Sequence, residues 1–362
     1  MRKGLIAASL ALLVGLAGCA DLGYYWQSVS GHLALMQAAR PVDELLVDVQ
    51  TPEKLKARLV LTQKIRNFAV SELKLPDNAS YQRYADLHRK AVVWNVVAAP
   101  ELSLTLKTWC FPVAGCVGYR GYFSESEAKR EAESLKAQDL EVSVYGVPAY
   151  STLGWSNWAG GDPLLSTFIG YPEGELARIV FHELAHQVAY APGDTAFNES
   201  FATAVERLGG ARWLATYGTD AAKAEYAVFD GRRQQFRALT RATRLRLLAV
   251  YRSIKQSNKP LAGNKYNYIA MKSGVIDDFK AQYEQLKVGW NGYAGYDGWV
   301  KTANNASFGA LAAYDDGVPQ FEALFVQEGG DWVKFFATVQ KLAKMPKEER
   351  DTALKVVLNK TI

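Results

Sequence analysis

Two of the four histidines in this 362-residue chain, His182 and His186, stand four positions apart, and Glu183 directly follows the first. Residues 173–190 have apolar residues at helical spacing, and Pro172 precedes them, which predicts a helix. On a helix, side chains four positions apart project from one face, so both imidazoles can bind one metal ion. Glu183 projects about 100° away, where its carboxylate can reach a water molecule without displacing it from the ion.

A catalytic zinc ion usually has three protein ligands and keeps a fourth position for water. After His186, the next acidic residue that opens a plausible helix is Glu199, which follows Asn198. The turn-forming residues 191–194 lie between them and let the chain reverse, so a second helix can bring Glu199 back beside the first. We therefore predict one zinc ion per chain, bound by His182, His186 and Glu199.

Two further carboxylates lie close to this predicted site in the sequence. Glu206 comes seven positions after Glu199 and shares its helix face, so it could orient a ligand histidine or be an ordinary surface group. Asp194 follows a glycine in the turn, where hydrogen bonding or helix capping is the expected role. The glycines at 209–210 are expected to end the second helix, which gives zinc helices within residues 173–208.

The N-terminus has the pattern of an export signal. Arg2 and Lys3 precede an apolar run, residues 4–16, that is shorter than the roughly 20 residues of a membrane-spanning helix. The run ends in Leu-Ala-Gly and Cys19, which resembles the bacterial lipobox, whose cysteine is acylated and becomes the new N-terminus. We expect a signal peptide over residues 1–18 and a membrane anchor on Cys19, facing the periplasm. An ordinary signal peptide cleaved nearby is the alternative.

Export would place the other two cysteines in an oxidising compartment. Cys110 and Cys116 enclose five residues that include a proline and a glycine, a spacing that fits a small disulfide loop. Two free buried thiols are the alternative.

The charge pattern does not indicate a nucleic-acid partner. Loss of Arg2 and Lys3 lowers the formal net charge from +5 to +3, which is a mild bias. Seven arginines between residues 232 and 252 alternate with apolar residues, which predicts an amphipathic helix with one charged face.

The histidine motif followed by Asn198 and Glu199 resembles the gluzincin metallopeptidases, the clan that includes thermolysin and the large zinc aminopeptidases. The resemblance implies that His182, His186 and Glu199 bind zinc and that Glu183 is the general base. Twelve residues separate His186 from Glu199, fewer than in most gluzincins. The loop between the two helices must therefore be short.

A second resemblance spans most of the mature chain. The lipobox, the cysteine pair, residues 147–155 and residues 194–199 resemble a family of predicted bacterial aminopeptidase lipoproteins. This resemblance implies a peptide substrate in the cell envelope. An endopeptidase, or a non-catalytic envelope binding or assembly lipoprotein that keeps the fold, is the alternative.

The gluzincin resemblance also implies groups that bind the substrate. A strand before the zinc helix pairs with the substrate backbone, and Gly154 is the candidate for that strand. A tyrosine is expected to stabilise the oxyanion, because the other two histidines lie far upstream; the candidates are Tyr268, Tyr293, Tyr296 and Tyr314. Aminopeptidases hold the free amine with an acid in the substrate strand, which residues 150–158 lack. The remaining candidates are Asp162, Glu173 and Glu206.

We predict an α+β fold with a zincin-like metallopeptidase core, in which a small mixed sheet lies beside a mainly helical half. The expected divisions are a tether over residues 19–50 and one domain over 51–362, with a sheet-rich part at about 91–160 and a helical C-terminal part at 211–362. The expected early helices are residues 53–73 and about twelve residues after Ser124. The expected strands are residues 92–97, 102–111, 117–123, 140–147 and 150–155.

Overall fold

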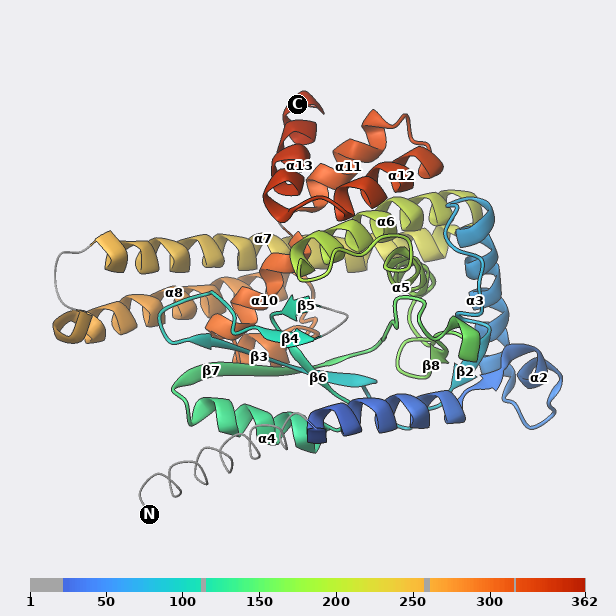
Figure 1. Ribbon diagram of the computed structural model, residues 1–362, viewed down its shortest axis with the longest axis horizontal. Coiled ribbons are helices and arrows are strands. Elements are labelled where there is room, and N and C mark those ends of the chain that lie inside the picture. The colour runs from blue at the N-terminus through green and yellow to red at the C-terminus, as the bar shows by residue number, and fades with distance from the viewer. Residues whose placement is uncertain (1–21, 112–114, 257–260, 316, 362) are drawn as a thin grey trace, which may run out of the picture.

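The computed structural model describes residues 22–111, 115–256, 261–315 and 317–361. The fold is α+β, as predicted from the sequence, with three small sheets beside a larger set of helices (Figure 1). The expected signal peptide and Cys19 lie outside the described residues. Among the described helices, none combines the length and apolar character needed to cross a bilayer.

The central sheet has the strand order β6-β3-β7 and is antiparallel throughout. Its strands are β3 (Val93–Pro100), β6 (Arg120–Tyr122) and β7 (Leu140–Val147). Alternate residues of β3 face opposite sides. Val96 and Ala98 pack with α4 (Glu125–Lys136), whereas Val97 and Ala99 pack with α10 (Asn305–Asp315). Because helices cover both faces, β3 is buried along nearly its whole length.

The other strands form two separate small sheets. One has the order β1-β2-β8, from β1 (Arg40–Pro41), β2 (Arg83–Ala85) and β8 (Leu164–Leu165). The other is the hairpin of β4 (Trp109–Phe111) and β5 (Gly115–Val117), in which Cys110 and Cys116 face each other and form a disulfide. The strands therefore belong to three sheets and not to one mixed sheet.

Three predicted strands differ in the structure. Residues 117–123 are not one strand, because residue 117 ends β5 and residues 120–122 form β6 in another sheet. Of residues 102–111, only the last three are a strand. Residues 150–155, which include Gly154, form turns because the buried carboxylate of Asp162 accepts hydrogen bonds from the backbone N–H and the hydroxyl of Thr152, at 3.0 and 2.7 Å. Gly154 itself has φ +82°, which a regular strand does not allow. The assignment of Gly154 to a substrate strand is therefore wrong.

Two helices near the N-terminus match the sequence prediction. The first is α3 (Glu53–Ser71). The second is α4, with twelve residues, in which the Ser124 hydroxyl accepts a hydrogen bond from the Glu127 backbone N–H. A further helix over residues 22–38 lies against β6, and α2 (Val42–Val47) and the short 3₁₀ helix η1 (Asn157–Ala159) complete this part.

The two helices predicted to carry the zinc ligands are α5 (Glu173–Ala185) and α6 (Thr195–Tyr217), which pack against each other at the centre of the molecule. Contrary to the prediction, α6 does not end at residues 209–210 but continues for two further turns. Glycine is needed at Gly209 for packing, because a methyl group there would lie 2.6 Å from Cδ1 of Leu73 and 3.0 Å from Cδ2 of Phe181.

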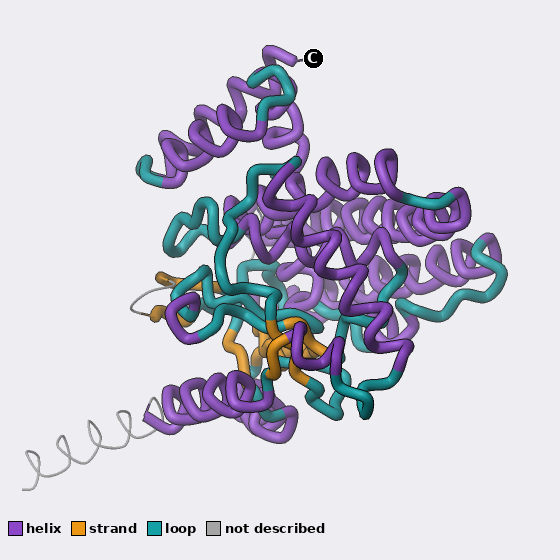
Figure 2. Tube along the Cα trace, turned by 90° about the vertical axis from the view of Figure 1, so that its right-hand side faces the viewer, coloured by secondary structure: helices purple, strands orange, loops and turns teal. Residues whose placement is uncertain are grey.

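The C-terminal half is helical, since all described elements after β8 are helices. Figure 2 shows the strands gathered in the lower part of the molecule, with most of the helices above them. The long pair α7 (Asp220–Gln256) and α8 (Leu261–Gly289) packs around its own aromatic cluster together with the short α9 (Asp297–Lys301). The predicted arginine-rich helix is part of α7. The last three helices pack on α6 at the top of Figure 1: α11 (Val318–Gln327), α12 (Trp332–Ala343) and α13 (Lys347–Thr361).

The packing at Gly209 predicts that Gly209→Ala destabilises the protein by about 1–3 kcal/mol, because the added methyl group overpacks the contact with Leu73 and Phe181. Urea unfolding measures the loss. Gly274→Ala is the matched control, because Gly274 lies in α8 with no atom within 4 Å of the added methyl group. There the change should stabilise the protein by about 0.5–1 kcal/mol. A stabilising effect at both positions would contradict the packing role.

Candidate metal centre

A short turn brings the two zinc helices together. The side chain of Asn198 pairs with the backbone of Ala191 in both directions: its Oδ1 accepts from the Ala191 N–H at 2.7 Å and its Nδ2 donates to the Ala191 carbonyl at 2.9 Å. Asp194 caps α6 by accepting from the Phe197 N–H. These bonds fix the start of α6, so that Glu199 faces α5 across the helix interface.

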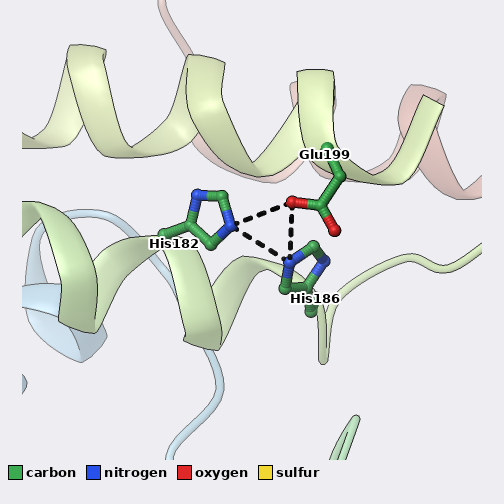
Figure 3. Close-up of side chains that lie close together, drawn as sticks. All are labelled: His182, His186 and Glu199. Atoms are coloured by element: carbon green, nitrogen blue, oxygen red, sulfur yellow. Dashed lines mark hydrogen bonds and ion pairs between the residues drawn. The ribbon is translucent and has the colours of Figure 1, made fainter. Parts of the chain in front are cut away.

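His182, His186 and Glu199 converge on one point between α5 and α6 (Figure 3). The two Nε2 atoms lie 3.2 Å apart, and Oε2 of Glu199 lies 3.4 Å from Nε2 of His182 and 3.9 Å from Nε2 of His186. Among the described residues, this is the group of histidine, cysteine and acidic side chains whose ligand atoms lie close enough to hold a metal ion. The structure therefore brings all three sequence-predicted ligands together.

The donor set fits a zinc ion. Tetrahedral zinc with bonds of about 2.0–2.2 Å separates its ligand atoms by about 3.3–3.6 Å, close to the three distances here. Two imidazole nitrogens and one carboxylate are also a common donor set of catalytic zinc. Nδ1 of His186 is buried and has no hydrogen-bond partner among the described residues, whereas Nδ1 of His182 is held by Glu206.

Glu206 positions His182 through the ring nitrogen Nδ1, which is the one that does not face Glu199. Its Oε2 lies 3.0 Å from Nδ1 of His182, and its Oε1 accepts a hydrogen bond from the buried guanidinium of Arg178. Burial would raise the pKa of Glu206, but Arg178 and His182 lower it overall, so this carboxylate is charged. A charged acceptor on Nδ1 fixes the ring so that Nε2 points toward Glu199.

Arg178 is in turn held by α7. Its guanidinium lies 3.3 Å from Asp230, and Asp230 accepts a hydrogen bond from Arg233 at 2.9 Å. Arg233 also pairs with both oxygens of Glu175, at 2.6 and 2.9 Å. Charges of alternating sign therefore run from the ligand His182 through α5, α6 and α7.

Burial changes the proton affinities in the cluster. It lowers the pKa of His186 to about 4, despite the opposing charge of Glu199, so this imidazole is neutral at pH 7. Burial would also lower the pKa of His182, but hydrogen bonds to Glu199 and Glu206 raise it well above its usual range. Burial raises the pKa of Glu183 to about 7; the His182 charge opposes this rise and the Glu199 charge adds to it. Glu183 can therefore both accept and release a proton near neutral pH.

Three of the four tyrosines predicted to stabilise the oxyanion lie away from the metal ligands. Tyr268, Tyr293 and Tyr296 pack in the aromatic cluster between α7 and α8, where the ring of Tyr296 stacks on Phe236 with centroids 4.0 Å apart. The side chain of Tyr314 lies outside the described residues.

Three other tyrosines lie near the metal ligands. Burial raises the pKa of Tyr119, Tyr145 and Tyr190, and the charge of Glu199 raises all three further. Tyr119 and Tyr145 come from the central sheet and the loop beside it, and Tyr190 comes from the turn after α5. The four tyrosines predicted from the sequence all follow Glu199, whereas Tyr119, Tyr145 and Tyr190 precede it.

The three acids proposed for the substrate amine all bind other groups of the protein. Asp162 is 1% exposed and holds the turn at Thr152 and Ser156. Glu173 accepts a hydrogen bond from the indole of Trp213 at 2.9 Å. Glu206 is bound to His182 and Arg178, as described above.

Comparison with known protein families matches residues 23–354 to the family described as putative aminopeptidase. The chain belongs to this family. The match to the putative aminopeptidase family runs from the helix over residues 22–38 into α13, so it includes both zinc helices and every charged group behind His182. No curated protein and no solved structure matches the chain. The family description supports peptidase activity.

The C-terminal helix α13 supports the turn of the metal centre. Arg350 is buried and donates to Oδ2 of Asp194 at 2.7 Å, and Lys347 donates to the same oxygen at 3.1 Å. Burial would raise the pKa of Asp194, but these two hydrogen bonds lower it overall. Asp194 thus both caps α6 and neutralises a buried arginine.

We expect Asp194→Ala to lower the free energy of unfolding by about 3–5 kcal/mol, because it removes the cap and leaves Arg350 buried without its partner. The matched control is Asp331→Ala. Asp331 caps α12 in the same way, but no ion pair of its side chain is found among the described residues. The control should lose about 1 kcal/mol. Urea unfolding of both variants decides the matter, and equal losses would mean that the pair with Arg350 contributes nothing.

Proposed function

We propose that this protein is a zinc-dependent aminopeptidase, anchored to a bacterial membrane through Cys19 and acting on peptides in the periplasm. The observation that carries the proposal is the convergence of His182, His186 and Glu199 with Glu183 beside them on α5. The family match supports peptide-bond hydrolysis as the reaction.

The chain's own residues perform the proton transfers. A zinc ion bound by the three ligands supplies Lewis-acid polarisation of the scissile carbonyl and acidifies water. Glu183 takes a proton from the attacking water and passes it to the leaving amine, for which a pKa of about 7 is suited. Glu206 and Arg178 keep His182 oriented during these steps.

The oxyanion of the tetrahedral intermediate needs a hydrogen-bond donor. We assign this role to one of Tyr119, Tyr145 and Tyr190, because the charge of Glu199 acts on all three and because burial raises the pKa of each phenol, so that each keeps its proton. Tyr145 also has a side-chain hydrogen bond with Asn95, which fixes its ring in β7.

An endopeptidase remains the second candidate, and one observation favours it. Asp162, Glu173 and Glu206 all hold groups of the protein itself, so none offers an unengaged carboxylate for a substrate amine. The family description favours the aminopeptidase.

A peptide library with free and acetylated N-termini tests the choice. We expect the purified zinc-loaded protein to release single residues from free N-termini and to leave the acetylated peptides uncut. Internal cleavage of acetylated peptides would establish the endopeptidase in its place.

Two variants separate metal binding from proton transfer. Glu183→Gln should keep zinc near the wild-type content and lower kcat by about 10²-fold or more, because the base is lost while the ligands remain. Glu199→Ala should lose most of the zinc and with it the activity. Metal analysis and peptide hydrolysis measure the two effects. Glu133→Gln, at an exposed position on α4, is the control and should change neither. Near-normal turnover by Glu183→Gln would remove Glu183 from the mechanism.

Phenylalanine variants identify the oxyanion donor. Among Tyr119→Phe, Tyr145→Phe and Tyr190→Phe, we expect one to lower kcat by about 10²-fold at unchanged zinc content. Tyr293→Phe is the control, because Tyr293 lies in the aromatic cluster between α7 and α8, and it should keep full activity. If all three variants kept wild-type kcat, the assignment would be wrong.

A further inference from the structure

The helix over residues 22–38 exposes a stripe of large apolar side chains. The stripe consists of Leu22, Tyr25, Trp26, Val29 and Leu33, whose exposed fractions range from 42% to 74%. At about 100° per residue, these five positions fall within an arc of about 100° on one face of the helix. An arc of this width is typical of a helix face that is buried, but among the described residues nothing covers it.

The same helix has no charged side chain, since residues 22–39 contain no Asp, Glu, Lys or Arg. A helix facing water normally places such residues on its outer side. The neighbouring helix α4 does so, with exposed residues such as Glu125, Lys129 and Arg130. The apolar stripe is therefore a property of this helix and not of the whole surface around it.

The opposite face fixes the helix on the protein. The amide of Gln27 donates to the Gly121 carbonyl and accepts from the Phe123 N–H at 3.0 Å, so it pairs with the chain at β6. Gly31 lies so close to Phe123 that a methyl group there would be 2.3 Å from its Cγ. Leu35 is buried in the main core. Because these contacts hold one face inward, the stripe must point outward.

We propose that this stripe lies on the surface of a lipid bilayer, with its side chains inserted among the lipid head groups and the first part of the acyl chains. The inference rests on the proposed lipid anchor. Cys19 precedes Leu22 by three residues, which span at most about 10 Å, so an acyl group on Cys19 brings the start of the stripe to the membrane surface. Trp and Tyr, both present in the stripe, favour this interface.

The driving force is apolar burial and not attraction to anionic lipids. The nearby cations of α4 already pair with carboxylates: Lys129 with Glu125, Arg130 with Glu127 and Lys136 with Glu133. Binding should therefore occur on neutral phosphatidylcholine as well as on anionic lipid, and it should depend little on salt.

Two attachment points, the acyl group on Cys19 and the stripe, fix the orientation of the enzyme on the membrane, whereas an anchor on Cys19 alone leaves the protein free to turn about it. In Figure 1 the helix over residues 22–38 runs along the lower edge of the molecule and the last three helices lie at the top, with α5 and α6 between them. A membrane below this edge leaves the zinc helices on the side of the sheet away from the bilayer.

A fluorescent label at residue 29 tests the proposal. The full-length protein is purified with Val29→Cys or, as a matched control, with Val333→Cys, an exposed valine on α12. Cys110 and Cys116 are joined in a disulfide, so the new thiol takes the bimane label. Mass spectrometry first determines whether Cys19 is acylated; if it is free, serine replaces it in both proteins. The labelled proteins are then mixed with phosphatidylcholine vesicles that contain lipids with a doxyl quencher near the glycerol.

We expect the lipid quencher to reduce the emission at residue 29 at least about threefold more than at residue 333, and aqueous iodide to do the reverse. Equal access of iodide to both labels would overturn the proposal. Shielding from iodide without lipid quenching would also overturn it, because a second protein copy would then cover the stripe. Lipid quenching of a protein whose Cys19 is not acylated would support insertion of the stripe and count against acylation of Cys19. Failure of the stripe proposal and failure of the proposed lipid anchor are therefore distinguishable.

Discussion

The candidate metal centre depends on the buried ion pair between Arg178 and Glu206. A carboxylate must be charged to hold His182, but an uncompensated buried charge costs several kcal/mol. Arg178 supplies the compensation from α5, and Asp230 on α7 compensates Arg178 in turn. This requirement explains Gly210: a methyl group there would lie 2.9 Å from Cγ of Arg178, so only glycine lets the arginine cross α6.

The position of Glu199 depends on the C-terminal helix α13. Glu199 lies one turn into α6, whose start is capped by Asp194 and locked by Arg350 of α13. The position of His182 therefore depends on α7, and the position of Glu199 depends on α13. This arrangement gives a physical reason why the family match extends over residues 23–354 and is not confined to the histidine motif.

Local patterns could be predicted from the sequence, and tertiary contacts could not. The spacing of His182 and His186 lies within one helix, so helical geometry alone puts both imidazoles on one face. The glycines at 209–210 were misread because the C-cap rule is local, whereas their role is to let α6 approach Leu73, Phe181 and Arg178. Residues 150–155 have the composition of a strand, but the carboxylate of Asp162 folds them into turns. Tyr119 and Tyr145 reach the neighbourhood of Glu199 through the central sheet and the loop beside it, a tertiary arrangement that no spacing along the chain reveals.

The loop between His186 and Glu199 is short and well fixed by hydrogen bonds. Within its twelve residues, Asn198 satisfies both backbone groups of Ala191, and Asp194 satisfies the first turn of α6. Few conformations remain for such a loop, so the position of Glu199 is set before any ligand binds. The conformational entropy of the loop is then lost when the chain folds, so that it need not be lost when an ion binds, which would favour a higher metal affinity. Asn198 thus fixes the backbone of the turn, and this places the adjacent Glu199 beside His182 and His186.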